Sequence, residues 1–409
     1  MMVVRAPLPA DYEPTYKGLK PQCSMDSFKE RTWMTTRSTL LCTVGTSLLE
    51  TNIARLPNVP FEPPVGWEAL KQAFERSQWQ QLAQLLLEIS PTHRVCGAEI
   101  NTIEEAVKHK WIRLQNLVLL VSDTERGRQT GEVLKHYFRA RRDLNLQNVE
   151  YDVIEALQDA DPKEFRTRGL RNLVRRIGHF VQRFGREYVA IDATGGYKAQ
   201  IAVAVIIGQA MDIPVFYKHE RFSEIIDFPP LPVSFDWDVL AENADLLALF
   251  ERGKAFSSEE IGEVDDRLRV LLTEEEVDGQ TLYELSPIGQ IYMESFRIRH
   301  PRPPQLVPAE NREPPRLREH HYPTGLREFM HKVWQENNWI SRVYTVSYDR
   351  QASIKGVGFR VQQVDGERLL VGTYRDHTGF GARFAVRLTD ESPVVLAWAA
   401  NHLNTQYAE

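Results

Sequence analysis

The chain has 409 residues, of which 42% are hydrophobic and 26% are charged, and its formal net charge is −6. This composition is typical of a globular protein with two or three domains, and it argues against a chain that is basic throughout. Three cysteines without metal-type spacing favour a cytoplasmic location. No run of about 18 uncharged apolar residues predicts a membrane span, and the first residues lack the apolar core of a secretory signal.

The first part of the chain predicts an extension followed by an α/β domain. Residues 1–37 are polar and proline-containing, without a hydrophobic period. Helix-length segments, such as 130–144 and 170–184, separate apolar runs of strand-like composition. These runs are 38–44, 114–122, 148–154, 186–192 and 213–218. Apolar strands that alternate with helices indicate a parallel sheet covered on both faces, so we expect a Rossmann-like, doubly wound domain over 38–235.

Three smaller parts are predicted after this domain. Residues 236–296 follow a Pro-rich boundary and predict helices, a hairpin with its turn at 278–279 and a further helix, an order that resembles a winged helix. Residues 297–323 are rich in Pro and Arg, which indicates an extended linker. Residues 324–409 predict a small α+β domain: a helix over 326–339, then five stretches, most of them with strand-like alternation. These stretches are RVYTVSYDR, VGFRVQQVD, RLLVGTYR, ARFAVRLTD and PVVLAWAAN.

Loops rich in Gly, Ser and Thr follow the first, second and fourth predicted strands. They read TVGTSLLETN (43–52), SDTERGRQTG (122–131) and ATGGYKAQ (193–200). Ligands of open parallel sheets bind beyond the carboxyl ends of the strands, and such loops expose N–H groups that bind phosphate. Lys198 adds a positive charge. Neither GxxxxGK[ST] nor GxGxxG occurs in these loops, so ATP hydrolysis and NAD binding lack their signatures, and we expect a different nucleotide site.

The segments LLCTVGTSLLETN, AEI, LVLLVSDTERG and AIDATGGYKAQIA resemble, in this order, the CARF domain of type III CRISPR effectors. The resemblance spans about 38–235. It implies a homodimer that binds one cyclic oligoadenylate, cyclic tetra-adenylate in the first instance, across its two-fold axis; no cofactor is implied. Two copies of one pocket suit a symmetric ring of phosphates. The positions that would line the site are Thr43, Gly45, Thr46, Ser47, Ser122, Asp123, Thr124, Thr194, Gly195, Gly196 and Lys198.

The segment from 368 to 404 resembles the second half of a RelE-type toxin. With the CARF part, the chain resembles CARF–RelE fusions, which are CRISPR-associated mRNA interferases. This implies a metal-independent endoribonuclease that cleaves mRNA on the ribosome and arrests translation. The 2′-hydroxyl attacks the neighbouring phosphate while basic groups stabilise the phosphorane and other side chains move protons. The implied catalytic residues are Arg383, Arg387 and Arg375 for phosphate, and His402, Tyr374 and His377 for proton transfer.

Several alternatives stay open. Residues 240–295 carry 14 acidic and 4 basic residues, so 4 minus 14 gives −10, which is unfavourable for DNA binding and suggests docking to a basic ribosomal protein. A HEPN ribonuclease that cuts free RNA would use the RxxxxH pair Arg316 and His321. A non-enzymatic regulator would use the winged helix on DNA. A further hypothesis is that the CARF site slowly cleaves its own ligand.

Overall fold

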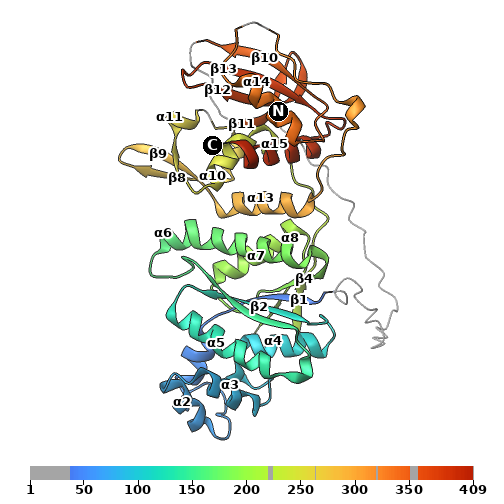
Figure 1. Ribbon diagram of the computed structural model, residues 1–409. Helices are drawn as coiled ribbons and strands as arrows, with labels where there is room; N and C mark the ends of the chain where they lie inside the picture. Colours follow the sequence, from blue (N-terminus) through green and yellow to red (C-terminus); the bar gives the residue numbers. More distant parts are fainter. Residues whose placement is uncertain (1–36, 220–223, 263, 319–320, 351–357, 409) are drawn as a thin grey trace, which may run out of the picture.

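The computed structural model describes residues 37–219, 224–262, 264–318, 321–350 and 358–408. The predicted N-terminal extension therefore lies outside the described residues, apart from Arg37. We refer to residues 38–235 as the N-terminal domain, 236–296 as the middle segment, 297–323 as the linker and 324–409 as the C-terminal domain. Figure 1 shows these parts stacked along one direction, with the middle segment between the two larger domains.

A six-stranded sheet forms the centre of the N-terminal domain. Its order is β3-β2-β1-β4-β5-β6; the pairs from β3 to β5 are parallel, and β6 pairs antiparallel with β5. The strands are β1 (Thr39–Thr43), β2 (Asn116–Ser122), β3 (Asn148–Ile154), β4 (Val189–Asp192), β5 (Val215–Lys218) and β6 (Ile225–Phe228). All five predicted strands are present, which confirms the predicted α/β class. The antiparallel edge strand β6 was not predicted.

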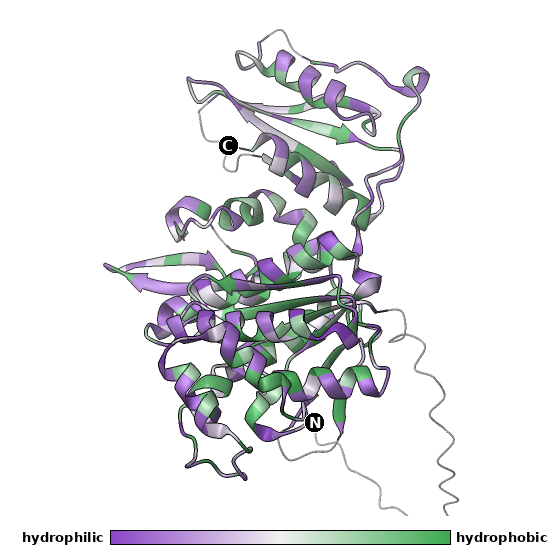
Figure 2. Cartoon of the chain, turned by 60° about the horizontal axis from the view of Figure 1, so that its bottom comes forward, coloured by the Kyte–Doolittle hydropathy of each residue, from purple (hydrophilic) through white to green (hydrophobic). Residues whose placement is uncertain are grey.

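Helices cover both faces of this sheet. Successive strand residues point to opposite faces, so Leu40 and Cys42 pack on one group of helices while Leu41 packs on the other. Because both faces are covered, the central strands are hydrophobic along their length, as Figure 2 shows in green. The first face is covered by α4 (Gly97–Lys108) and α5 (Glu125–Ala140), and α3 (Trp79–Leu87) and α2 (Trp67–Glu75) form an outer layer that packs on α5 and η1. The second face is covered by α7 (Leu170–Phe184) and α8 (Lys198–Met211), with the short α6 (Pro162–Glu164) before α7.

Short helical turns connect several of these elements. They are η1 (Leu48–Ile53), η2 (Arg94–Cys96), η3 (Arg142–Leu144), η4 (Phe165–Gly169) and η5 (Arg186–Tyr188). The segment 186–188, predicted as the start of a strand, forms η5. None of the helices in the described ranges is long and apolar enough to cross a membrane.

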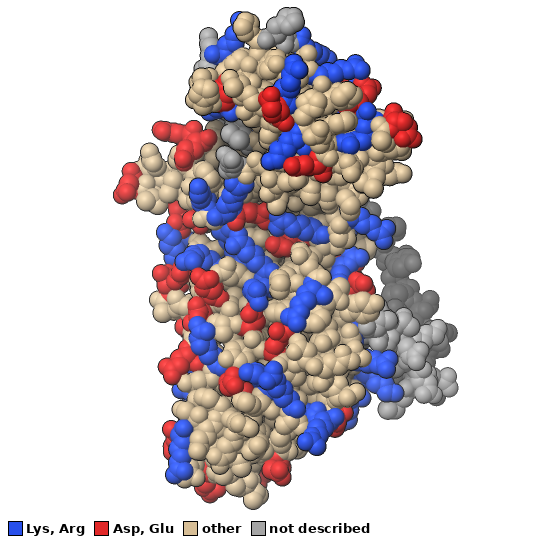
Figure 3. Space-filling view, viewed as in Figure 1, with Lys and Arg blue, Asp and Glu red and all other residues tan. Residues whose placement is uncertain are grey.

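The middle segment contains short helices and a small sheet of order β7-β9-β8. Its predicted hairpin is present: Asp278 and Gly279 both have positive φ (51° and 77°) and join β8 to β9. The elements are α9 (Asp238–Glu242), α10 (Ala244–Glu251), β7 (Phe256–Ser257), α11 (Ser258–Ile261), α12 (Asp266–Arg269), β8 (Leu272–Val277), β9 (Gln280–Leu285) and α13 (Pro287–Arg299). Figure 3 shows the acidic side chains that gather at this hairpin.

Helix α13 joins the two halves of the molecule. Its residues Ile291 and Ile298 pack in the core between α7 and α8, whereas Met293 and Phe296 pack in the core shared with the C-terminal domain. The helix also continues three residues beyond the predicted segment boundary at 296. It is therefore a shared structural element of both halves, and a movement of α7 or α8 would be passed to the middle segment through it.

The C-terminal domain is a four-stranded antiparallel sheet of order β10-β13-β12-β11 with two helices. One face packs on both helices, and we call the other the open face. Leu370, Phe384 and Val386 belong to the helix-covered core, whereas Leu369 and Ala385 belong to the open face. The elements are α14 (Leu326–Glu336), β10 (Arg342–Asp349), β11 (Gly358–Val364), β12 (Glu367–Arg375), β13 (Gly381–Arg387) and α15 (Pro393–Tyr407).

One prediction for this region is wrong. The stretch PVVLAWAAN, grouped with the strands, begins helix α15. Its Val and Trp residues favour strands, but Pro393 suits the first helical turn and the alanines have the highest helix propensity. The linker contains the short turn η6 (Ala309–Asn311) and pairs with the edge strand β10 through Arg316 and Tyr344. A covered edge strand is protected from pairing with other chains.

Candidate functional site

The candidate ligand site lies where the strand order of the large sheet reverses. Strands β1 and β4 are parallel neighbours, and the chain proceeds from β1 to one side of the sheet and from β4 to the other. Ligands of such sheets bind beyond the carboxyl ends of the two strands at this switch point. Two of the three predicted loops, 43–52 and 193–200, begin there.

These two loops are in close contact. The Thr43 hydroxyl donates to the Gly195 carbonyl at 2.6 Å. A Cβ atom on Gly195 would lie 2.7 Å from the Thr43 carbonyl oxygen and 2.9 Å from the Gly45 nitrogen, and one on Gly45 would lie 3.0 Å from the Gly196 nitrogen. Gly196 also has a φ of +96°. The glycines are thus required by the close approach of two backbones, and the structure brings four predicted ligand residues together.

Glu99 of α4 fixes the β1 loop through a hydrogen bond to its backbone. This residue was not among the predicted site residues. It is fully buried in α4, its Oε1 accepts from the Gly45 N–H at 2.8 Å, and no hydrogen bond reaches its Oε2 from the described residues. Burial raises the pKa of this carboxyl. Gln200, also fully buried, accepts from the Tyr197 N–H on the other loop. The sequence signal was the AEI segment, which marked Glu99 without indicating its contact.

Thr194 has a structural role in the β4 loop. Its hydroxyl donates to Asp192 Oδ1 at 2.5 Å and accepts from the Lys218 N–H at 3.0 Å. Asp192 is fully buried and also accepts from the Cys42 thiol at 3.4 Å. This network fixes the start of the loop that carries Gly195, and it occupies the Thr194 hydroxyl that was predicted to contact ligand.

The pKa of Asp192 predicts a change of stability with pH. Burial raises it from 3.8 to about 7. Between these pH values the carboxyl keeps its proton in the folded protein but has lost it in the unfolded chain. The contribution of Asp192 to the free energy of unfolding is therefore fully present below pH 3.8 and is lost as the pH rises to about 7. Asp192→Asn should flatten the fall of the melting temperature over this range. Asp278→Asn, on the exposed β8–β9 turn, should keep the wild-type dependence of the melting temperature on pH. If the curve of Asp192→Asn ran parallel to that of the wild type, Asp192 would not be the group that titrates.

The third predicted loop is one strand away, and its side chains are engaged locally. Ser122 and Thr124 share a hydrogen bond of 2.9 Å, and Thr124 caps α5 by accepting from the Gly127 N–H at 2.9 Å. Asp123 accepts from the Ala156 N–H at 3.0 Å and pairs with Arg128. The structure therefore places Ser122, Asp123 and Thr124 in the cap of α5 rather than in contact with the glycines.

A pocket of about 220 Å³ opens beside the β1 loop. Of the predicted ligand residues, Ser47 lines it, while Thr46 donates to Glu50 at 2.6 Å. Residues that were not predicted supply the basic and aromatic groups of the pocket: Phe61, Arg94, Lys218 and His219. The N-terminus of α4 also reaches the pocket through Gly97 and Ala98, so N–H groups and cations line one hollow, which suits an anion.

Lys198 is the first residue of α8 and is exposed. None of the ion pairs found among the described residues involves it. A cation at the start of a helix is unfavourable for the helix dipole, and this placement is favourable only when a negative group is bound there. Lys198 thus follows directly after the apposed glycines, where an anionic ligand would meet it.

In the C-terminal domain, the predicted residues divide between the two faces of the sheet. Residues two apart in a strand lie on the same face. Arg383 and Arg387 flank Ala385 at this spacing, and Arg375 follows Val371 and Thr373 at the same spacing. Because Ala385 and Val371 lie on the open face, all three arginines point to it. Arg387 is paired with Glu391 at 2.7 Å and with Glu367 at 2.8 Å. Arg383 has no ion pair within the described part of the chain, and its buried Nε has no hydrogen-bond partner there. Arg375, at the end of β12, is exposed and likewise forms no ion pair among the described residues, so Arg383 and Arg375 are both available to a phosphate, whereas Arg387 is not.

The candidates for proton transfer lie elsewhere. Tyr374 is on the helix-covered face, where its hydroxyl donates to the Thr324 carbonyl at 2.8 Å. His402 stacks on Trp398 of the same helix, with ring centroids 4.6 Å apart, and burial lowers its pKa. His377 is exposed in the β12–β13 turn. The structure thus does not bring Tyr374 and His402 to the arginines. Over the described ranges, no cluster of three or more His, Cys, Asp or Glu side chains is arranged to hold a metal ion.

The fold and the loop geometry define an α/β protein with two apposed glycine loops at the switch point of its sheet, joined to a small antiparallel domain. Residues 94–231 match the model of a family described as CRISPR-associated protein (Cas_APE2256). The match begins at η2 and ends after β6, so it includes the β4 loop, Glu99 and Lys198, but neither β1 nor the C-terminal domain. This part of the chain is therefore similar to a CRISPR-associated family.

No curated protein is detectably similar to the chain in sequence. The similar solved structures include Can2 from Sulfobacillus thermosulfidooxidans in complex with cyclic tetra-adenylate, at 11% sequence identity and a TM-score of 0.24. The match covers 65% of this chain and 64% of that chain, so this chain spans slightly less than two thirds of the length of Can2. A TM-score of 0.24 is too low to establish a shared fold.

Proposed function

We propose that the protein is a cyclic-oligoadenylate-activated, metal-independent endoribonuclease of type III CRISPR immunity that cleaves mRNA on the ribosome. The apposed glycine loops at the switch point carry this proposal, because they bring close-packed glycine backbone and Lys198 together at the place where such sheets bind nucleotides. The similarity of residues 94–231 to a CRISPR-associated family supports the assignment to CRISPR immunity. In a homodimer, two copies of the site would enclose one ring.

The open face of the C-terminal sheet supplies the proposed reaction site. The RNA 2′-hydroxyl attacks the adjacent phosphorus, the new O–P bond forms, and the bond to the 5′ oxygen breaks. The proton of the 2′-hydroxyl leaves to a base, and a proton is delivered to the departing 5′ oxygen. Arg383 would stabilise the additional negative charge of the phosphorane. Such stabilisation of developing charge is usually the largest single contribution to the rate of an enzymatic step. Arg387 is already paired with Glu367 and Glu391, so its role would be to hold β13 against these neighbouring segments.

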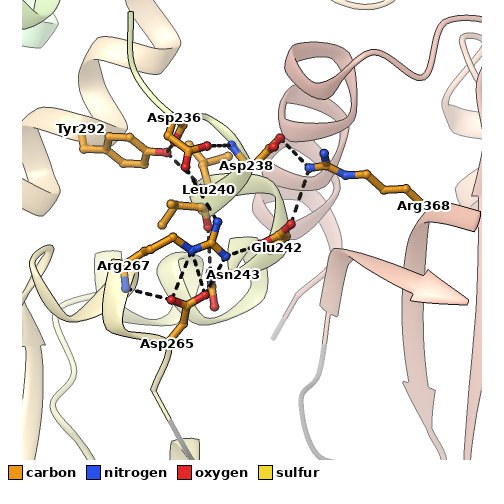
Figure 4. Close-up of polar contacts among 10 residues, drawn as sticks. Asp236, Asp238, Leu240, Glu242, Asn243, Asp265, Arg267, Tyr292 and Arg368 are labelled. Carbon is orange, nitrogen blue, oxygen red and sulfur yellow. Dashed lines mark hydrogen bonds and ion pairs between the residues drawn. The ribbon is translucent and has the colours of Figure 1, made fainter. Parts of the chain in front are cut away.

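Coupling between the two sites would pass through α13 and the middle segment. Arg175 of α7 donates to the Gln290 side chain of α13 at 3.0 Å and to the Glu251 carbonyl of α10 at 2.7 Å. On the other side, Arg368 of β12 is paired with Asp238 of α9 at 2.6 Å, as Figure 4 shows. A change at α7 could therefore shift the C-terminal sheet through groups that are already in contact, which is the physical requirement for allostery.

Replacing Arg175 by alanine should uncouple the sites. We expect activation by cyclic tetra-adenylate to fall at least about fivefold, since couplings of 1–3 kcal/mol are typical. RNA cleavage with and without ligand measures the effect, and calorimetry checks that ligand is still bound. Arg176→Ala is the matched control, because this neighbour on α7 pairs with Asp152 inside the N-terminal domain alone. An equal loss in both variants would contradict the path through α13.

The test of the function is RNA cleavage with and without cyclic tetra-adenylate, on naked RNA and on translating ribosomes. Ligand-dependent cleavage on ribosomes alone is the expected result. Efficient cleavage of naked RNA would favour a HEPN-like or other free ribonuclease, although the four-stranded sheet of the C-terminal domain differs from an all-helical HEPN domain. No cleavage in either case would favour the DNA-binding regulator, which a mobility shift with and without nucleotide would test.

A further inference from the structure

The linker contributes basic side chains to the open face of the C-terminal sheet. Its backbone runs beside β10: the Arg316 N–H donates to the Val343 carbonyl at 2.9 Å, and the Thr345 N–H donates to the Arg316 carbonyl at 3.1 Å. The Arg318 N–H donates to the Thr345 hydroxyl at 3.0 Å. The linker thus joins the edge of the sheet through one isolated parallel bridge, and these three hydrogen bonds fix its position relative to the arginine face.

Two guanidinium groups meet on one tyrosine ring at this edge. Arg318 lies 5.4 Å and Arg342 lies 5.2 Å from the ring centroid of Tyr344. Tyr344 belongs to the open face, where it stands opposite Ala385 of β13. No carboxylate of the described ranges forms an ion pair with Arg318 or Arg342. Like charges on one ring repel each other, so this arrangement is stabilised by an anion between or beside them.

The tyrosine and its two arginines adjoin the proposed reaction site. Tyr344 on β10 and Arg383 on β13 lie on adjacent strands, which are about 4.8 Å apart, and on the same face. A nucleic-acid strand needs cations for its phosphates and flat groups for its unstacked bases, and basic residues interleaved with an aromatic ring provide both. Arg316 is less available, because it pairs with Glu313 at 2.7 Å.

We propose that Arg318, Arg342 and Tyr344 form a binding subsite for single-stranded RNA beside Arg383, with the linker as one wall. This rests on the proposed ribonuclease function and deepens it, because it places a nucleotide that flanks the cleaved bond. The base stacks on Tyr344 and the guanidinium planes, and the adjacent phosphate lies between Arg318 and Arg342. The linker then has a binding role in addition to connecting the domains.

The test measures RNA binding separately from cleavage. The full chain is titrated into a fluorescent single-stranded 2′-O-methyl RNA of about 12 nucleotides, which lacks the attacking hydroxyl. Arg318→Ala should weaken binding at least about fivefold and reduce the salt slope by about 0.7. Tyr344→Leu should weaken binding with an unchanged salt slope. Arg302→Ala removes the same charge from an exposed position earlier in the linker and should bind within about twofold of the wild type.

Two results would overturn the subsite. One is unchanged RNA affinity in Arg318→Ala; the other is an equal loss in Arg302→Ala, which would indicate net charge alone. If polyglutamate displaced the RNA and bound with the same dependence on Arg318, the surface would belong to an acidic protein partner. Cleavage of mRNA on translating ribosomes with cyclic tetra-adenylate, by the same preparations, separates the two proposals: binding through Arg318 without any such cleavage would retain the subsite and reject the ribonuclease.

Discussion

Arg383→Ala is expected to lower activator-dependent RNA cleavage by about 10²–10³-fold, the loss typical when one fixed donor to a developing anion is removed. The expectation follows from its position on the open face without a carboxylate partner in the described part of the chain. Arg387 differs, because Glu391 and Glu367 already neutralise it. Single-turnover cleavage on translating ribosomes, at saturating cyclic tetra-adenylate, measures the effect.

The controls for Arg383→Ala separate chemistry from folding and charge. The variant should keep the wild-type melting temperature and bind cyclic tetra-adenylate with unchanged affinity, because Arg383 lies in the other domain. Arg269→Ala removes an equal charge from the exposed α12 and should cleave like the wild type. Arg383→Lys should recover part of the activity, since an ammonium retains the charge without the planar fork. Wild-type cleavage by Arg383→Ala would remove the open face from the mechanism.

The large sheet was predictable because its physical causes are local. Strands that are buried on both faces must be apolar along their length, so runs such as 114–122 stand out without any knowledge of partners. The turns after β1 and β4 were predictable for the same reason, since glycines directly after buried strands indicate a close backbone approach. The edge strand β6 was missed because only its first residue, Ile225, is buried.

The parts that were not predicted depend on contacts between distant segments. Nothing near Glu99 indicates that its carboxylate would accept from Gly45, 54 residues away. The pairing of the linker with β10 likewise depends on a strand that lies later in the chain, and no residue of the linker itself indicates that contact. His402 was predicted to follow a last strand, but it lies within helix α15, whose packing on the sheet overrides the strand preference of Val394 and Val395.

The geometry also indicates why sensing and cleavage would be linked. Helix α13 buries residues in both large cores, so neither half can move without affecting its packing. A Cβ on Gly178 of α7 would lie 2.8 Å from the Glu294 carboxylate of α13, which shows how closely these helices approach. Close-packed interfaces shift between discrete arrangements rather than deform continuously. A ligand that moved α7 or α8 would therefore select one arrangement of the C-terminal domain.

Gly195→Ala is expected to abolish binding of cyclic tetra-adenylate, with a loss of at least about 100-fold in affinity, and with it ligand-dependent cleavage. The new methyl group would collide with Glu99 and lie 2.7 Å from the Thr43 carbonyl, so the two loops would have to separate. Isothermal titration calorimetry measures the affinity. Gly279→Ala, on the β8–β9 turn with no atom near its Cβ, strains the backbone without such a collision and should bind normally.

Because separated loops could also destabilise the N-terminal domain, a second variant keeps the ligand site testable. Lys198→Gln leaves the core unchanged, since Lys198 is exposed at the start of α8. This variant should lower the affinity for cyclic tetra-adenylate about tenfold at an unchanged melting temperature. A phosphate of the ligand would lose the cation but keep its contact with the glycine loop. If Gly195→Ala unfolds and Lys198→Gln binds like the wild type, the ring does not lie at the switch point. If both weaken binding while the fold persists, the apposed loops and the start of α8 form one anion site.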